Sequence, residues 1–260
     1  MRQDRKKRDI AGESPACARR EGDLCYPFVR YEKQLVMTNP GWFTEYGGDL
    51  VSFALCSVLL IVYHVYLGFK LRKHPEYTIQ GVNRAARRAW VEGIMGDPER
   101  SVLAVQTLRN STMAATFLAS TAVLLIIGTL TLSGQADKLA IAIHALNIVG
   151  SHHPELWIFK LMLMVSDFFV AFFAFSMAIR LFNHVGYQIN VPTAIRPKNV
   201  SPAKVAIHLN RAGNYYSIGM RAYYFAVPLV FWLFGPQFMV IATLVLIAVL
   251  YHVDRVPKSG

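Results

Sequence analysis

The sequence predicts an all-α polytopic membrane protein with four transmembrane helices and additional cytoplasmic amphipathic helices. Of its 260 residues, 54% are hydrophobic and only 17% are charged, and the mean hydropathy is +0.33. The apolar residues gather into four runs, each meeting the roughly 20 residues that a helix needs to cross a bilayer. Basic residues fall mainly between these runs. The runs span residues 50–69, 113–132, 156–182 and 223–250.

The placement of the basic residues predicts the orientation. Residues 70–112 hold eight Lys and Arg and residues 180–221 hold six, whereas the loop 133–155 holds only Lys138. Because cytoplasmic loops carry an excess of Lys and Arg, the loops 70–112 and 180–221 are expected in the cytoplasm, in a cell (inner or plasma) membrane. Both termini would then lie outside. The net charge of +11 is interpreted as a signal for anionic lipid headgroups rather than nucleic acid.

Three segments are expected along the chain. Residues 1–36 carry nine Lys and Arg without hydrophobic periodicity and are expected to form a disordered basic tail. Residues 37–255 form the four-helix membrane domain, and residues 256–260 form a second tail. A basic tail is hard to translocate, so two explanations stay open: translation starts at Met37, or the N-terminus is cytoplasmic and the topology is inverted.

A helix over residues 98–132 is expected to begin as a polar segment and to become a span without a break. Asp97 is its cap and Pro98 its first-turn proline. One half of this helix is polar and the other carries small or apolar side chains. Either the polar stripe has a function, or its hydroxyls bond back to their own helix and the stripe only packs. The polar half holds Gln106, Arg109, Asn110, Thr116, Ser120 and Thr131, and the other half holds Ala115, Ala119, Ala122 and Ile126.

Two further helices are expected outside the spans. Residues 78–94 carry several Arg and a Trp, namely Arg84, Arg87, Arg88 and Trp90, and predict a surface helix against anionic headgroups. Ser201-Pro202 is a helix-start signal for residues 202–216. In the fourth run, Pro228 and Gly235-Pro236 are expected to kink the helix, or to break it at a binding site.

Asp167 is the candidate functional residue within a span, because a carboxylate near the centre of a membrane helix is unfavourable unless it is paired or protonated. Lys160 lies two turns away, about 10 Å by helix rise. Asp167 is therefore either a proton or cation site, or a hydrogen-bonded group that locks packing against Ser120 or Thr121. The intramembrane polar residues considered are Asp167, Lys160, Ser120 and Thr116.

A second candidate site is an anion or lipid site near the inner boundary. Convergent Arg, Asn and Tyr side chains there are suited to a lipid phosphate or a carboxylate, and the alternative is ordinary anchoring by basic residues. Its residues are Gln106, Arg109, Asn110, Arg211, Arg221, Tyr223 and Tyr224.

Histidines give two weaker hypotheses, while no cofactor or metal is predicted. His64 and His184 could ligate a haem axially. On the outer side, His144, His152, His153 and Glu155 could bind a transition metal. No catalytic motif is found, so the chain is expected not to be an enzyme.

Several blocks of sequence resemble a known family. They include 88–91, the Gln-Thr-Leu-Arg-Asn block at 106–110, 113–116, 221–224 and 232–236, together with Asn210, Gly213, Tyr216, Ser217 and Gly219. Together they resemble the membrane proteins of bacteria and plants known as domain of unknown function 599, over about residues 50–255. This resemblance implies a four-span membrane protein and no particular activity.

Three hypotheses about function follow. The first is a non-catalytic membrane protein, either an accessory or scaffold subunit or an anionic-lipid binder through the inner arginine cluster. The second is a small transporter or channel that uses Asp167, and the third is a haem-carrying redox protein. Expected partners are the bilayer and its anionic headgroups, and a larger membrane complex or a second copy of the chain, with no nucleic acid.

Overall fold

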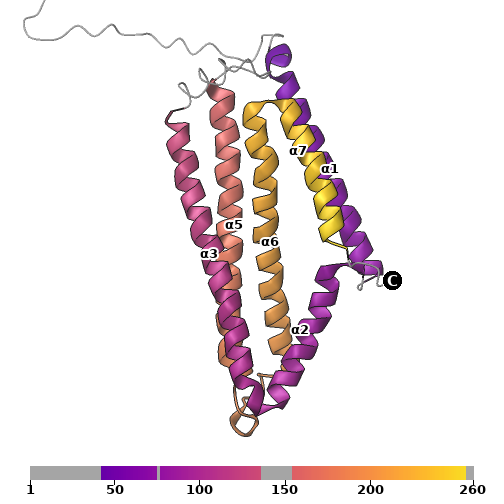
Figure 1. Ribbon diagram of the computed structural model, residues 1–260, viewed down its shortest axis with the longest axis vertical. Helices are drawn as coiled ribbons and strands as arrows, with labels where there is room; N and C mark the ends of the chain where they lie inside the picture. Colours follow the sequence, from indigo (N-terminus) through magenta and orange to yellow (C-terminus); the bar gives the residue numbers. More distant parts are fainter. Residues whose placement is uncertain (1–41, 75–76, 136–153, 256–260) are drawn as a thin grey trace, which may run out of the picture. The chain divides into compact units, whose positions relative to one another are not determined.

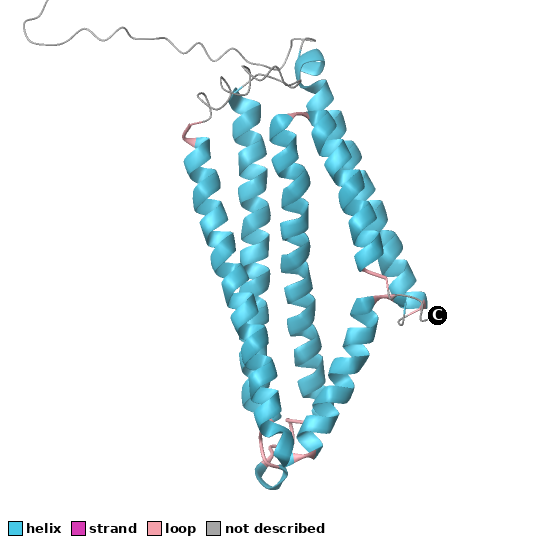
Figure 2. Ribbon diagram, in the orientation of Figure 1, coloured by secondary structure: helices cyan, strands magenta, loops and turns pink. Residues whose placement is uncertain are grey.

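The computed structural model describes residues 42–74, 77–135 and 154–255. The chain divides into two units, residues 1–39 and 40–260, and the described residues all belong to the second. These residues form helices joined by short connections (Figures 1 and 2). The predicted tails 1–36 and 256–260 lie outside the described residues. The helices are α1 Trp42–Lys73, α2 Ile79–Gly96, α3 Ser101–Ser133, α5 Pro154–Ile189, α6 Pro202–Phe234 and α7 Pro236–Val253.

Five helices in the described part are long and apolar enough to cross a membrane: α3, α5, α6, α7 and α1 from Gly47 onward. The predicted fold class, an all-α polytopic membrane protein, is therefore confirmed, but the predicted count of four spans is wrong. The fourth apolar run contains the end of α6 and all of α7. Pro228 lies inside α6, which continues to Phe234.

The chain reverses direction at Gly235, where a kink was expected. Gly235 has φ 149° and ψ 158°, a backbone conformation that residues with a Cβ rarely adopt. Pro236 follows as the first residue of α7, a position that proline suits because it has no N–H to satisfy. Trp232 of α6 packs near Met239 of α7, and further along, Phe225 packs near Leu246. The two helices thus form an antiparallel hairpin.

Helix α1 lies beside α7 and runs parallel to it (Figure 1). Cys56 shares a buried cluster with Met239, and Tyr63 shares one with Leu246 and Leu250. Beyond α7, the carbonyl of Asp254 accepts a hydrogen bond from the N–H of Ile79, 3.2 Å away, at the start of α2. The end of α7 therefore lies beside the junction of α1 and α2, which corrects the expectation that both ends of the membrane domain lie away from the basic loops.

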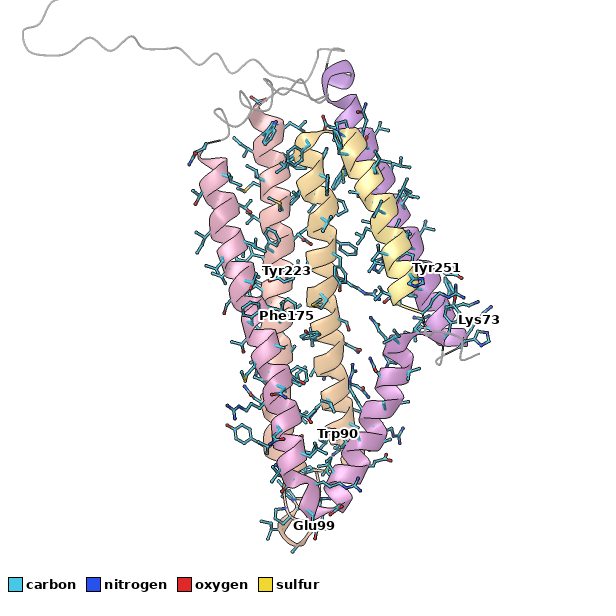
Figure 3. The ribbon with its side chains drawn as sticks, viewed as in Figure 1. Lys73, Trp90, Glu99, Phe175, Tyr223 and Tyr251 are labelled. Atoms are coloured by element: carbon cyan, nitrogen blue, oxygen red, sulfur yellow. The ribbon has the colours of Figure 1, made fainter. Side chains whose placement is uncertain are left out.

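We call this end of the bundle, which carries α2, the single turn Pro98–Arg100 and the connection between α5 and α6, the basic end. In Figure 3, the labelled residues Lys73, Tyr251 and Glu99 lie in this part of the bundle. Helices α3 and α6 have 33 residues and α5 has 36. At 1.5 Å per residue they are about 50–54 Å long, which exceeds the ~30 Å hydrocarbon core of a bilayer. Their basic-end segments therefore extend beyond the apolar runs.

At the basic end, α2 packs its apolar side onto these extensions. Its buried residues are Val91, Ile94 and Met95, which join buried residues of α3, α5 and α6 in one core. The helix predicted over 78–94 thus corresponds to α2, capped by the Thr78 hydroxyl, which accepts a hydrogen bond from the N–H of Gly81 at 3.2 Å. Protein covers the apolar residues near its end, whereas Ile79 and Val82 near its start are exposed.

Helix α3 is continuous from Ser101, after a separate turn over Pro98–Arg100 that Asp97 caps. The predicted division of its faces is confirmed: Ala115, Ala119 and Ala122 are buried, whereas Thr116, Ser120 and Thr131 are exposed. The buried alanines let α3 approach α5 closely, where Ala171 and Phe175 join the same cluster. The Thr116 and Thr131 hydroxyls donate to the carbonyls of Thr112 and Ile127, each at 2.9 Å, as the packing alternative for the polar stripe expects.

Candidate functional site: a cavity at the basic end

An open cavity of about 800 Å³ lies at the basic end, with walls formed by α2, α3, α5 and α6. Helices α2 and α3 are joined by the short turn Pro98–Arg100 and diverge from it, so the sides that face each other make little contact. Figure 3 shows Trp90 on the α2 wall. The volume falls in the range of ligand pockets, roughly 300–1,000 Å³. The lining residues are Asn83, Ala86, Arg87, Trp90, Thr107, Leu108, Asn110, Ser111, Ala114, Phe182, Leu209, Gly213, Tyr216 and Ser217.

Arg87 is the charged residue of this lining. Its Nη1 donates a hydrogen bond to Oδ1 of Asn210 on α6, 3.3 Å away. Its guanidinium lies against Gly213, where an added Cβ would come within 2.4 Å of the Arg87 Cζ. Gly213 therefore leaves the space that the guanidinium fills. Asn210 also donates from Nδ2 to the carbonyl of Arg84, 3.4 Å away, which fixes α2 to α6 at this level.

The electrostatics of Arg87 are those of a partly desolvated cation. The side chain is half-buried, and burial lowers the pKa of its guanidinium, with the neighbouring charge of Arg84 adding to this effect. Arginine still stays positively charged at neutral pH. Within the described residues, no carboxylate lies within ion-pair distance of Arg87, and no described lining residue of the cavity is acidic. The site therefore carries a net positive charge.

The rest of the lining combines two kinds of side chain. Apolar surface comes from Trp90, Leu108, Phe182 and Leu209. Hydrogen-bonding groups come from all three of α2, α3 and α6. These are the amides of Asn83 and Asn110 and the hydroxyls of Thr107, Ser111, Tyr216 and Ser217. Such a lining suits a ligand that has both an anionic and an apolar part.

The residues predicted for an inner anion site do not form one cluster. All four of Asn110, Gln106, Arg109 and Arg211 are exposed, and of these only Asn110 lines the cavity. The hydroxyl of Tyr223 donates to the carbonyl of Leu118 and links α6 to α3. Tyr224 packs against the cluster between α1 and α7.

Arg221, the remaining member of that set, belongs to a separate network. Its Nη2 lies 3.5 Å from Oδ2 of Asp254, and the Tyr63 hydroxyl donates to the same oxygen at 3.1 Å. This network ties α1 and α6 to the residue that follows α7. It borders a small cavity of about 90 Å³, which His64 also lines.

The two histidines of the haem hypothesis lie at different levels. Nδ1 of His64 lies 2.8 Å from the carbonyl of Leu60, while His184 is exposed on α5. Asp49 on α1 contacts Lys160 on α5, so these two residues mark the same level on the two helices. From this level, His64 lies about 22 Å along α1 and His184 about 36 Å along α5. Both helices run toward the basic end, so the two rings are about 14 Å apart in height within one chain. This placement does not bring them to one iron.

The outer metal hypothesis falls mostly outside the described residues. His144, His152 and His153 are not described, and Glu155 is exposed in the first turn of α5. Elsewhere in the described part, no group of three or more His, Cys, Asp or Glu side chains is arranged to hold a metal ion.

A buried ion pair lies at the end of the bundle opposite the basic end. Nζ of Lys160 on α5 lies 2.8 Å from Oδ1 of Asp49 on α1, and both side chains are at most 3% exposed. Nε1 of Trp232 on α6 donates to the same Asp49 oxygen at 2.7 Å, and Lys160 donates to the Trp232 carbonyl at 3.2 Å. The Trp232 ring stacks on Phe53. Three helices are thus joined by one polar cluster.

Asp167 lies further along α5 and does not pair with Lys160. One of its carboxyl oxygens, Oδ2, is buried and has no hydrogen-bond partner within the described part of the chain. The proposed locking partners are engaged or turned away: Thr121 donates to the carbonyl of Phe117 at 2.9 Å, and Ser120 is exposed. Asp167 therefore places one buried carboxyl oxygen, without a partner among the described residues, inside a candidate span.

Arg87 and Asp49, one central residue of each polar site, were missed as sites in the sequence, whereas Lys160 was among the intramembrane candidates. Arg87 was considered only as a headgroup contact, yet it lies four and seven residues before the buried Val91 and Ile94. This spacing puts Arg87 on the inward face of α2. Helical periodicity in the sequence could therefore have indicated its position. Asp49 and Lys160 are single opposite charges near the same end of two parallel spans, which also hints at a pair. Asn210 and Gly213 gave no such signal, because their role depends on where Arg87 points.

Comparison with known proteins gives one match. A family model described as "Protein of unknown function, DUF599" matches residues 51–259. No curated protein and no solved structure matches the chain.

Proposed function

The chain belongs to the DUF599 family of proteins of unknown function, and from its geometry we propose that it is a non-catalytic integral membrane protein that binds an anionic ligand in the cavity between α2 and α3. Arg87 is the observation that carries this proposal. A half-buried cation without a carboxylate partner among the described residues leaves its charge uncompensated, which a bound anion would correct. The planar guanidinium is suited to two parallel hydrogen bonds with a carboxylate or a phosphate.

The depth of the cavity supports a ligand found at a membrane boundary. On α3 the lining runs from Thr107 to Ala114, and the apolar run of this helix begins at residue 113. The cavity therefore lies where α3 passes from polar to apolar sequence. We propose that the basic end faces the cytoplasm, as the excess of Lys and Arg in residues 70–112 and 180–221 favours.

Replacing Arg87 tests the proposal. In Arg87→Gln protein reconstituted in nanodiscs of zwitterionic lipid, binding of octanoate and octyl phosphate is expected to weaken roughly tenfold to a hundredfold. This follows from the loss of charge-assisted hydrogen bonds worth about 1.5–3 kcal/mol. Binding is measured through the change in tryptophan fluorescence, for which Trp90 is the reporter in the cavity.

Two further variants make this test specific. Arg88→Gln removes the neighbouring charge on the same helix, which is 68% exposed and pairs with Glu92 at 3.2 Å, and should leave binding unchanged. Gly213→Ala keeps the charge of Arg87 but pushes its guanidinium aside, and should weaken binding. Equal losses in the Arg87 and Arg88 variants would mean that only general surface charge attracts the anion.

Asp167 supports a second candidate function, a small transporter or channel for protons or cations. The supporting observation is its buried, unpartnered carboxyl oxygen inside a candidate span. In proteoliposomes under an imposed pH gradient and potential, flux through the native protein is expected to be abolished in Asp167→Asn, because the amide cannot carry a proton. Asp167→Glu, which restores a carboxyl group, should recover part of the flux. If the native protein shows no flux of any ion tried, this candidate fails.

A further inference from the structure

The lining of the cavity changes character along its length. On α2, Asn83, Arg87 and Trp90 lie on successive turns, and Trp90 is the closest of the three to the turn Pro98–Arg100. Helix α6 runs the other way, so Leu209 lies on the Trp90 side of Gly213 and Ser217 on the opposite side. The level of Arg87 therefore divides the cavity into two parts.

The part beyond Arg87, farther from the apolar runs, holds the large apolar side chains. Trp90 lies about 4.5 Å farther along α2 than Arg87 by helix rise. Leu108, Phe182 and Leu209 belong to the buried core at this level, where α2, α3, α5 and α6 meet. We call Trp90, Leu108, Phe182 and Leu209 the apolar floor. Leu108, Phe182 and Leu209 expose only 5–7% of their surface and Trp90 is partly buried, so the apolar surface that they present to the cavity is limited. An apolar occupant that covers this surface releases the water there.

The part on the other side of Arg87 holds small and polar side chains together with the ring of Tyr216. Asn83, Ala114 and Ser217 lie toward the apolar runs of the helices. A phospholipid that kept both acyl chains in the bilayer could reach Arg87 with its headgroup. It would leave the apolar floor empty, because its chains would extend in the opposite direction. The arrangement thus favours a ligand whose apolar part points away from the membrane.

Resting on the proposed anion site, we infer that its ligand is a single-chain amphiphile with one anionic group, a carboxylate or a phosphate. The anionic head pairs with Arg87 and accepts hydrogen bonds from the amides and hydroxyls nearby, and the chain lies on the apolar floor. A volume of about 800 Å³ accommodates such a molecule, whereas an inorganic anion would fill only part of it. The protein would take this ligand out of the leaflet at the basic end.

A chain-length series tests this inference without altering the protein. Linear carboxylates of four to fourteen carbons, alkyl phosphates and the matching alcohols are competed against dansylaminoundecanoate, whose emission is excited by energy transfer from Trp90. The protein is held in zwitterionic nanodiscs, and empty nanodiscs correct for partition into lipid. Each added methylene is expected to raise the affinity by about twofold to fourfold until the floor is covered. In the native protein, the alcohols should bind about tenfold more weakly than the carboxylates of the same chain length. In Arg87→Gln, the alcohols, carboxylates and alkyl phosphates of one chain length should bind with equal affinity.

Each outcome separates this inference from the proposed function. If butyrate or inorganic phosphate competes as well as dodecanoate, the anion site stands and the amphiphile is excluded. If an anionic two-chain phospholipid in the nanodisc displaces the probe better than any single-chain ligand, the placement of the chain on the apolar floor is wrong. If no anion binds, or if Arg87→Gln binds every ligand as the native protein does, the proposed function fails too. Trp90→Phe should strongly reduce the energy transfer if the probe lies in this cavity, because the other three tryptophans of the chain do not line it.

Discussion

Lys160→Met is expected to destabilise the protein by about 3–5 kcal/mol, because it leaves the buried carboxylate of Asp49 without its cation. Lys160 is 2.8 Å from this carboxylate, and the remaining donor would be Nε1 of Trp232, at 2.7 Å. Little water reaches the pair, so solvent cannot replace the lost charge. The loss should appear as a large drop in the thermal unfolding temperature in detergent or nanodiscs.

The double variant Asp49→Asn with Lys160→Met provides the first control. It removes both charges while keeping an acceptor for Trp232, and should recover much of the stability, since a buried pair and a well-packed neutral replacement are often equivalent. The exposed pair of Arg88 with Glu92, 3.2 Å apart, is the second control: Arg88→Met should change stability by less than about 1 kcal/mol. A loss of similar size from both pairs would show that burial is not what makes the first one matter.

Gly235→Ala is expected to destabilise the hairpin of α6 and α7 by about 1–3 kcal/mol, because a Cβ is strained at φ 149°. Gly235 ends α6, where its N–H donates to the carbonyl of Trp232 at 3.2 Å, and it immediately precedes α7. Relief of the strain would disturb Trp232 and, through it, the contact with Asp49. Thermal unfolding of the reconstituted protein measures the loss.

Gly186→Ala is the matched control for this substitution. Gly186 lies within α5, and an added Cβ there meets no atom within 4 Å. Alanine favours a helix over glycine by roughly 0.5–1 kcal/mol, so this variant should be slightly more stable than the native protein. Opposite signs for two identical substitutions would locate the effect in the backbone conformation of Gly235. A neutral Gly235→Ala would mean that the turn between α6 and α7 can be made in another way.

The candidate site was only partly accessible from the sequence. A polar group on α3 at the membrane boundary was expected, and Asn110 does line the cavity. The expected arginines were others, because Arg109, Arg211 and Arg221 are conspicuous at the starts of apolar runs. The position of the charged group of a long side chain depends on the helix that packs opposite it. The pattern of residues along the sequence does not identify that helix.

The sequence by itself determined that the chain is a bundle of membrane helices, because apolar runs of bilayer length allow few other structures. It also determined the polar start of α3 and the faces of that helix, since both follow from helical periodicity. It did not determine the number of spans: one apolar run of residues 223–250 is compatible with a kinked helix or with a hairpin. Only the packing of α7 beside α6 and α1 decides between them.

Arg87 and Arg88 show most directly what tertiary structure adds. The two residues are adjacent and chemically identical, yet Arg88 is exposed and pairs with Glu92, while Arg87 lines a cavity against Gly213. Their directions differ by about 100° around α2, and the core of Val91, Ile94 and Met95 fixes which side of α2 faces α6. The sequence contains the charge of Arg87. Its burial, on which the proposed anion site rests, comes from the contact between two helices that lie far apart along the chain.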